Sequence, residues 1–335
     1  MQKDFHYYCI GVLARAAGFN NEDSLAIAFA SQYANDSTES DPIRIGDILF
    51  DPVRSSTSGL KRFDWSIQKR VYIPFHFIPP HPIRAPNDPF ATSSHSPFAV
   101  NILKEAFNVT HEMRRLCRVG LALHALADSW AYQGFSGREN DENRVENIFR
   151  LRGTRWQPIQ LENLLLDIVP QIGHVEAGYL PDQPFLVWKY KRKLSNNVIE
   201  RNNESEFFQS AKVIYYLLQD AEKLRFVPPI PWANIKDDIR ILLEYPEQSL
   251  NKRCQKWRDC FKSIFHPLEF RYDRRAWRND ALEPEDETAT DWDDFNPSDF
   301  KRLRFPMKRG FYNSPWLHFH RAALRQRHLV LENLL

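Results

Sequence analysis

A histidine and an aspartate stand one helical turn apart inside an almost fully apolar stretch of the chain. The stretch is RVGLALHALADSWAYQGFSG, and the two residues are His124 and Asp128. Positions four apart in a helix lie on one face, roughly 40° apart about the axis. An ionisable pair in a buried helix is costly unless it has partners. The pair is therefore interpreted either as a structural hydrogen bond or as two ligands of a metal ion.

Further polar residues lie in apolar surroundings elsewhere in the first 182 residues. They stand at the ends of amphipathic helical patterns, between two phenylalanines, or in an apolar run: Asp4 and His6, Asn35 and Asp36, His76, and His174 with Glu176. The residues around them are of types that are normally buried. Each one alone is more readily explained as a core residue with a hydrogen-bond partner. Together they indicate a shared centre.

Five short phrases follow one another along the chain in a distinctive order. They are DFH at 4–6, QYANDST at 32–38, PFHF at 74–77, HALADSWAYQGFSG at 124–137, and GH at 173–174 followed by PDQP at 181–184. In this order they resemble the zinc-dependent phospholipase C and single-strand-specific nuclease superfamily, and more closely a bacterial branch of it. The resemblance covers roughly residues 1–190, and the phrase at 124–137 is its specific part.

The resemblance implies an all-α fold, with a multi-helix metal-binding domain, long loops and, in this chain, an irregular C-terminal extension. It also implies one to three zinc ions and metal-dependent hydrolysis of a phosphodiester, such as a nucleic acid or a phospholipid headgroup. Asp36 is the candidate catalytic residue, as general base or bridging ligand. The candidate metal ligands that the resemblance gives are Asp4, His6, Asp36, His76, His124, Asp128 and His174.

Three features depart from the superfamily. Tyr132 stands where the bacterial branch has a histidine, and tyrosine is a poor zinc ligand. Gly178 replaces a carboxylate that the enzymes have four residues after the later histidine, and Glu176 and Asp182 are the candidates to compensate. The secreted enzymes use a free N-terminal amine as a ligand, and Asp4 is the expected substitute here. These departures keep open a second hypothesis, a non-catalytic interaction or scaffold protein that binds a protein partner through its C-terminal half.

Composition sets outer limits on the fold and the function. The 335 residues suffice for one large domain or two small ones. The net charge is +2, from 45 basic and 43 acidic residues, so the overall charge of the chain does not indicate nucleic-acid binding. No apolar stretch reaches ~18 residues and no targeting segment is visible, so we expect no membrane span and a cytoplasmic location. Cys9 and Cys117 lie in apolar helical patterns and are predicted to be buried.

Hydrophobic periodicity predicts a helical chain with a loop-rich segment at 41–96 and a short strand near 71–73. A Pro-rich connector at 226–232 is a soft boundary between a helical metal-binding domain, 1–225, and the C-terminal extension, 226–335. The predicted helices are 5–17, 22–34, 97–107, 110–133, 141–151, 160–176, 204–224, 232–244, 247–264 and 317–333.

Residues 252–279 are basic and interleaved with aromatics, a pattern that can bind phosphates and stack on bases. The alternative is a solvated helix face with Trp257 and Phe261 turned to the core. An acidic run at 283–294 follows, which either neutralises the basic stretch or forms a mobile loop. His318 and His320 alternate as in a strand but begin a helical pattern, so metal binding there is the weaker interpretation. The candidate nucleic-acid-binding residues are Lys252, Arg253, Lys256 and Arg258.

Overall fold

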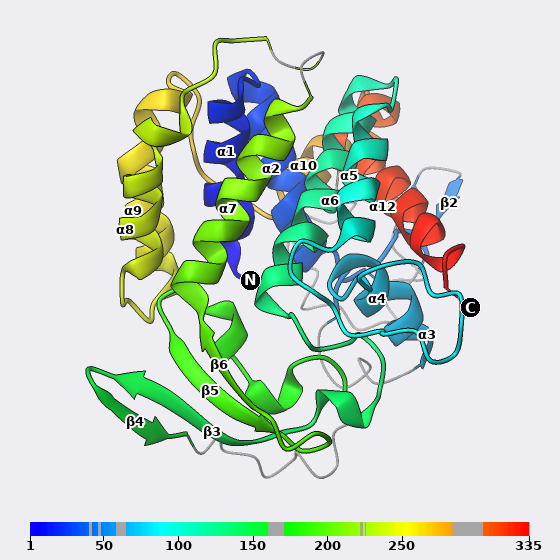
Figure 1. Ribbon diagram of the computed structural model, residues 1–335. Coiled ribbons are helices and arrows are strands. Elements are labelled where there is room, and N and C mark those ends of the chain that lie inside the picture. The colour runs from blue at the N-terminus through cyan, green and yellow to red at the C-terminus, as the bar shows by residue number, and fades with distance from the viewer. Residues whose placement is uncertain are drawn as a thin grey trace.

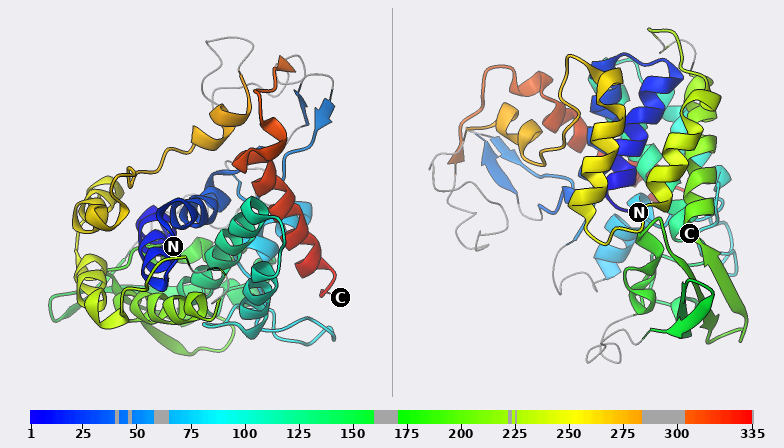
Figure 2. Two further views of the ribbon diagram at one scale, coloured as in Figure 1. Left: turned by 90° about the horizontal axis from the view of Figure 1, so that it is seen from above. Right: turned by 90° about the vertical axis from the view of Figure 1, so that its left-hand side faces the viewer.

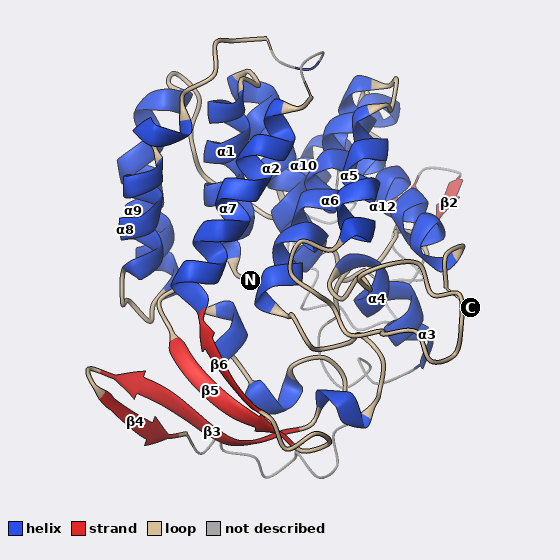
Figure 3. Cartoon of the chain, viewed as in Figure 1, coloured by secondary structure: helices blue, strands red, loops and turns tan. Residues whose placement is uncertain are grey.

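The computed structural model has a helical body with a four-stranded antiparallel sheet beneath it, as Figures 1 and 3 show. The prediction of an all-α fold is therefore wrong, and the fold is mixed α/β. The structure describes residues 1–39, 42–45, 48–57, 65–159, 171–221, 224, 226–283 and 304–334. The N-terminus lies at the centre of the molecule, between the lower ends of two helices and above the sheet (Figure 1).

Helix α6, Glu112–Ala131, is the centre of the helical body. It is buried from Leu116 to its end, because its apolar residues cover almost the whole circumference. Gly120 lies directly against the next helix, and a Cβ atom there would come within 2.4 Å of the backbone oxygen of Ile27. The helices that pack around it are α2, Asn21–Asp36; α5, Pro97–Phe107; α7, Asn203–Gln219; and α12, Pro315–Leu331.

The chain begins with a π-helix, η1, Asp4–Cys9, which continues into α1, Ile10–Ala17. Every residue of η1 is buried, and α1 ends at Gly18, whose φ of 111° places it in the left-handed region that favours glycine. Asn20 then caps α2 by accepting a hydrogen bond from the backbone of Asp23 at 2.7 Å. The predicted stop and restart between the first two helices is confirmed, and it lets α1 pack back on α2, which itself packs on α6.

The larger sheet has the order β4-β3-β5-β6, and every neighbouring pair is antiparallel. Its strands are β3, Val145–Arg152; β4, Arg155–Pro158; β5, Val187–Arg192; and β6, Val198–Asn202. The helix predicted at 141–151 is wrong, because VENIFRLR pairs with WKYKR of β5 rather than coiling on itself. Trp188 and Tyr190 form the covered face of β5 and lie against the bottom of the helical body.

A smaller sheet lies beside α12 and has the order β2-β1-β7, with β1 parallel to β7. Its strands are β1, Ile43–Ile45; β2, Ile48–Phe50; and β7, Arg304–Phe305. The strand predicted near 71–73 is wrong, since these residues belong to a helical segment. This segment consists of α3, Trp65–Ile67; the π-helix η3, Gln68–Tyr72; and α4, Ile73–Phe75.

The second half of the chain wraps around the first, as the two views of Figure 2 show. Its described α-helices are α8, Lys236–Glu244; α9, Leu250–Phe265; α10, Ala276–Ala281; and α12. Helix α9 packs on η1 and α12 packs on α6, so helices from both predicted units share contacts. Within the described ranges, no helix is both long and apolar enough to cross a bilayer.

The remaining sequence-based expectations divide into confirmed and undescribed segments. The predicted helices at 22–34, 97–107, 110–133, 247–264 and 317–333 correspond to observed ones, and Cys9 and Cys117 are buried as predicted. Most of the predicted helix at 160–176 and of the acidic run at 283–294 lies outside the described residues. The described residues also form short 3-10 helices: η4, Asp141–Asn143; η5, Val175–Ala177; η6, Leu180–Asp182; η8, Trp232–Asn234; and η10, Phe311–Asn313.

Candidate metal centre

Both carboxylate oxygens of Asp128 lie at the centre of a fully buried cluster of imidazoles. His6 Nε2 lies 3.1 Å from Oδ1, and His76 Nδ1 lies 3.1 Å from Oδ2. His124 Nε2 approaches Oδ2 at 3.2 Å from one turn earlier on the same helix. The structure thus brings together three of the predicted histidines with Asp128, and they come from η1, the turn after α4, and α6.

The three imidazole rings pack on one another as well as on the carboxylate. The rings of His6 and His124 are stacked with centroids 3.9 Å apart, while His76 meets His124 edge-on at 5.0 Å. The Nδ1 atoms of His6 and His124 are buried and have no hydrogen-bond partner among the residues that the structure describes. Buried polar atoms without a partner are uncommon, and in a native structure each one calls for an explanation.

His76 is oriented by a backbone carbonyl as well as by Asp128. Its Nε2 atom lies 2.9 Å from the oxygen of Ser55, which can only accept a hydrogen bond. Nε2 therefore carries a proton. On the other side of the ring, Nδ1 lies 3.1 Å from Asp128 Oδ2 and 3.2 Å from His124 Nε2, so His76 is held from both sides.

Burial controls the charges of the cluster. Burial, with His124 close by, lowers the pKa of His6 to about 3, and burial also lowers the pKa of His124. Burial alone would raise the pKa of Asp128, but the α-ammonium group of Met1 and the imidazole of His124 hold it well below its ordinary value. Near neutral pH His6 and His124 are therefore neutral and Asp128 is ionised, the protonation states that metal ligands need.

The α-amine of Met1 links Asp128 to a second carboxylate. It donates to Asp128 Oδ1 and to the hydroxyl of Tyr132, both at 2.8 Å, and lies 3.1 Å from Asp182. The Tyr132 hydroxyl in turn donates to Asp182 at 2.8 Å. Of the two carboxylates expected to compensate for Gly178, Asp182 thus reaches the cluster.

The other late residues of the resemblance lie at the edge of the cluster or outside it. The ring of His174 stacks on Tyr132 with centroids 4.5 Å apart, and its Nδ1 atom donates to the Gly178 carbonyl at 2.9 Å. Glu176 instead accepts a hydrogen bond from the backbone of Val145 at 2.5 Å, at the start of β3. His174 is therefore held beside the cluster rather than against Asp128.

Asp4 does not join the cluster, although it stands two residues before His6. Its Oδ2 atom pairs with the Arg253 guanidinium at 2.6 Å, and Oδ1 accepts from the backbone of Phe5. Positions two apart on a helix face in different directions. The expectation that Asp4 substitutes for an N-terminal amine is therefore corrected, because the amine of Met1 itself contacts Asp128.

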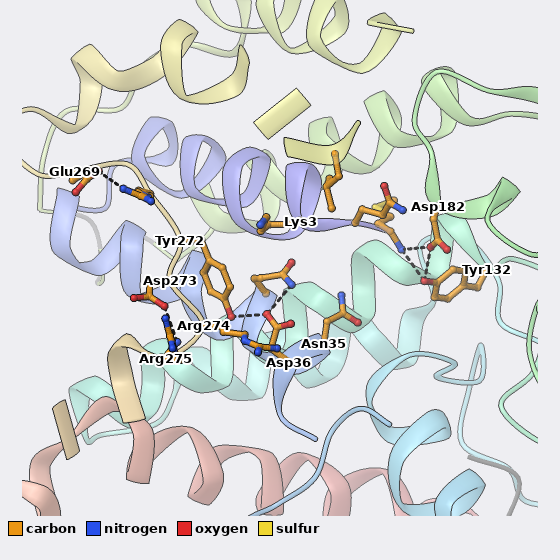
Figure 4. Close-up of a pocket in the computed structure, with 15 residues that line it drawn as sticks. Lys3, Asn35, Asp36, Tyr132, Asp182, Glu269, Tyr272, Asp273, Arg274 and Arg275 are labelled. Atoms are coloured by element: carbon orange, nitrogen blue, oxygen red, sulfur yellow. Dashed lines mark hydrogen bonds and ion pairs between the residues drawn. The ribbon is translucent and has the colours of Figure 1, made fainter. Parts of the chain in front are cut away.

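A cavity of about 950 Å³ adjoins the cluster (Figure 4). Tyr132, Asp182 and the first residues of the chain line one side of it, and Asp36 lies on another. Asp36 accepts hydrogen bonds from Tyr272 at 2.6 Å and from Gln32 at 3.0 Å. Among the described residues, no hydrogen bond joins Asp36 to the imidazole cluster. The structure therefore places Asp36 in the same cavity as Tyr132 and Asp182, at the end of α2.

The basic stretch at 252–279 was expected to offer a surface for phosphates and bases, but one of its arginines instead forms a buried ion pair near the cluster. Lys252 and Lys256 are exposed on α9 and Arg258 is partly exposed, whereas Arg253 is only 1% exposed. Trp257 and Phe261 face the core, as the alternative interpretation of this stretch predicts. Arg253 is thus an internal partner of Asp4 and is not part of an exposed basic surface.

Two members of the centre, the Met1 amine and Arg253, were missed in these roles by the sequence reasoning, whereas Asp182 was a candidate through the resemblance. The Met1 amine and Arg253 contact residues far away in the chain, and local spacing does not report such contacts. For Arg253, the one available signal was its position on α9 at the spacing of Trp257 and Phe261, four and eight residues further on, which marks the buried face.

Comparisons with known proteins place the chain in a family. Searches of curated proteins and of solved structures found no match. The model of the family DUF6765, described as a family of unknown function, matches residues 1–334. Because this match spans nearly the whole chain, the protein belongs to the DUF6765 family.

Proposed function

We propose that the protein binds a transition metal, zinc by its ligand types, at Asp128 and hydrolyses a phosphodiester in the adjoining cavity. The observation that carries the proposal is the convergence of three buried imidazole nitrogens on the two carboxylate oxygens of Asp128, at 3.1–3.2 Å. A metal ion shared by the imidazoles and the carboxylate would use these same atoms as ligands.

The chemistry of the cluster supports zinc. Imidazole nitrogen and carboxylate oxygen are the ligand types that zinc prefers outside thiolate sites. One ligand atom each from His6, His124 and Asp128 lie within 4.8 Å of one another, and all three residues are buried. Neutral histidines need no deprotonation before they bind a cation. Asp182 adds a second negative charge that favours a cation nearby.

When bound, zinc lowers the pKa of a water molecule and polarises the phosphate oxygens. The chain's own residues have complementary tasks. Asp128 holds three imidazoles toward one point, and Tyr132 orients Asp182 through its hydroxyl hydrogen bond. Asp36 lines the cavity as the candidate proton acceptor, with Tyr272 and Gln32 fixing its carboxylate. Lys3 also lines the cavity and supplies positive charge for an anionic substrate.

The test combines metal analysis with two substrates. Protein purified without chelator should contain at least about one equivalent of zinc. With zinc it should hydrolyse bis(4-nitrophenyl) phosphate or a short single-stranded oligonucleotide, and Asp128→Asn should abolish the activity. Asp36→Asn should lower the rate and leave zinc bound. Absence of zinc after titration, or hydrolysis that Asp128→Asn does not change, would exclude the proposal.

One contact favours the second candidate function, a non-catalytic interaction protein. The Met1 α-ammonium already supplies a positive charge between Asp128 and Asp182. Burial alone would lower the pKa of this amine, but the two carboxylates leave it raised. In that case the cluster stabilises the fold through these ion pairs and needs no metal. A protein that takes up no zinc, cleaves neither phosphodiester and is not stabilised by added zinc would support this candidate.

A further inference from the structure

Arg253 lies on α9, and its buried side chain joins the second half of the chain to residues 2–4 at the start of the first half. Its Nε atom donates to Asp4 at 2.6 Å, and an Nη2 atom donates to the side chain of Gln2. A guanidinium group offers five N–H donors in a rigid fork, so two acceptors on neighbouring residues can be held in fixed positions.

The guanidinium group is itself fixed from the other side. Its Nη1 atom donates to the backbone carbonyls of Glu247 at 2.7 Å and Gln248 at 3.1 Å, just before α9 begins. Backbone carbonyls ahead of a helix cannot turn as side chains do, so they set the direction of the fork. Arg253 therefore joins a rigid part of α9 to residues 2–4.

The residues that Arg253 holds lie between two groups that contact Asp128. The Met1 amine lies before Gln2 and contacts Asp128 at 2.8 Å, and His6 lies after Asp4 and contacts the same oxygen at 3.1 Å. A shift of residues 2–4 would move both groups, because η1 starts at Asp4 and carries His6. The geometry of the candidate metal centre thus depends on a residue more than a hundred positions after Asp128.

We infer that Arg253 is a positioning residue of the metal centre, which orients His6 through Asp4 and Gln2 and makes the second half of the chain part of the site. This inference rests on the proposed function. A buried ion pair that served stability alone would change unfolding without changing metal affinity. A positioning residue changes both, and partners behind metal ligands typically contribute 10–100-fold to metal affinity.

The variants Arg253→Gln and Asp4→Asn test the inference in the full chain. Zinc affinity, measured by competition with a chromogenic chelator, should fall about 10-fold or more in each. The double variant should bind zinc no more weakly than the worse single variant, because both changes break one link. Arg253→Lys keeps the charge but loses the fork, so it should not restore the affinity.

The matched control is Arg278→Gln, which removes another buried guanidinium of the second half, on α10. It should lower stability and leave zinc affinity within about twofold, because the ligands stay in place. If Arg253→Gln does not fold, Asp4→Asn decides alone, since it removes a charge and no packing volume. Wild-type affinity in both Arg253→Gln and Asp4→Asn overturns the inference while the proposed function stands. A wild-type chain that binds no zinc overturns both.

Discussion

His6 and His124 stack ring on ring, with centroids 3.9 Å apart and an angle of 26° between the planes, and both direct Nε2 at Asp128. Two protonated imidazoles at this distance would repel each other strongly in a buried site. The pair is therefore compatible with neutral rings, or with one cation that both rings share. This relationship links the first helix of the chain to the central one.

Replacing the ligands should remove the metal and weaken the fold together. In Asp128→Asn the Met1 ammonium group loses one of its two carboxylate partners and keeps Asp182, so the cost should not exceed about 3–5 kcal/mol, the cost of a fully broken buried pair. His124→Ala should cost about 1–3 kcal/mol, because it removes a buried hydrogen-bond partner of Asp128. Elemental analysis and urea unfolding measure the two effects. His328→Ala, on the exposed face of α12, is the control and should change neither. Retention of zinc by both ligand variants would show that the pair is peripheral.

Substituting Tyr132 by histidine tests whether the cluster can gain a metal ligand at this position. Its hydroxyl lies between the Met1 amine and Asp182, so Tyr132→His directs an imidazole toward the same groups. We expect tighter zinc binding or a higher zinc content in Tyr132→His. Tyr132→Phe removes the hydroxyl alone and should cost about 1–3 kcal/mol through the unpaired groups left behind. Isothermal titration with zinc compares the two variants, and equal affinity in Tyr132→His and Tyr132→Phe would contradict the prediction.

Nucleic-acid binding by α9 can be tested without disturbing the interior. The triple variant Lys252→Ala, Lys256→Ala, Arg258→Ala changes side chains that are exposed or partly exposed, so its stability should stay within about 1 kcal/mol of wild type. If α9 contacts single-stranded DNA, the variant should bind a labelled oligonucleotide more weakly, with a flatter dependence on salt. Unchanged affinity and salt slope would remove α9 from any nucleic-acid surface. Arg253 is left intact because it is buried against Asp4.

His320 should make the protein less stable in mild acid. Burial lowers the pKa of His320 to about 3, below the value near 6.5 of an unfolded chain. Between these values the unfolded chain binds the proton more tightly, so the stability present above pH 6.5 is lost as the pH falls. From pH 7 to pH 5 this residue should account for about 1–2 kcal/mol of that loss.

The variant His320→Asn isolates this contribution. An asparagine oxygen can replace the Nδ1 atom that accepts from the backbone of Val53 at 3.0 Å, and it does not titrate in this range. Urea unfolding of the variant at pH 7 and pH 5 should therefore show a smaller loss of free energy than the wild type shows. Equal losses in the two proteins would assign the acid sensitivity to other groups.

The helical body could be predicted because its pattern is local. The apolar residues of α6 recur along its whole length, and the N-cap of α2, Asn20, directly precedes that helix in the sequence. Strand β3 was mistaken for a helix because Val145, Ile148, Phe149 and Leu151 fit both periods in a short segment. What decides between them is β5, about forty residues later, which supplies the hydrogen bonds of the sheet.

The candidate site divides in the same way. His124 and Asp128 share a helical face by spacing alone, and the resemblance added His6 and His76, which the structure brings to the same carboxylate. The resemblance grouped Asp4 with His6 as ligands, but two positions apart in η1 face different ways, and the Asp4 carboxylate pairs with Arg253. Partners that meet only in the folded chain leave no mark on local spacing.

The link between Arg253 and Asp4 spans 249 positions, and that between the Met1 amine and Asp128 spans 127. During synthesis, residues 1–6 leave the ribosome long before α9 exists. Contacts this far apart in sequence form late in folding, because the loops between them must close first. A growing chain therefore presents His6 on an unanchored segment, and the full set of ligands comes together only after α9 has docked. Metal loading should accordingly follow the completion of folding rather than nucleate it.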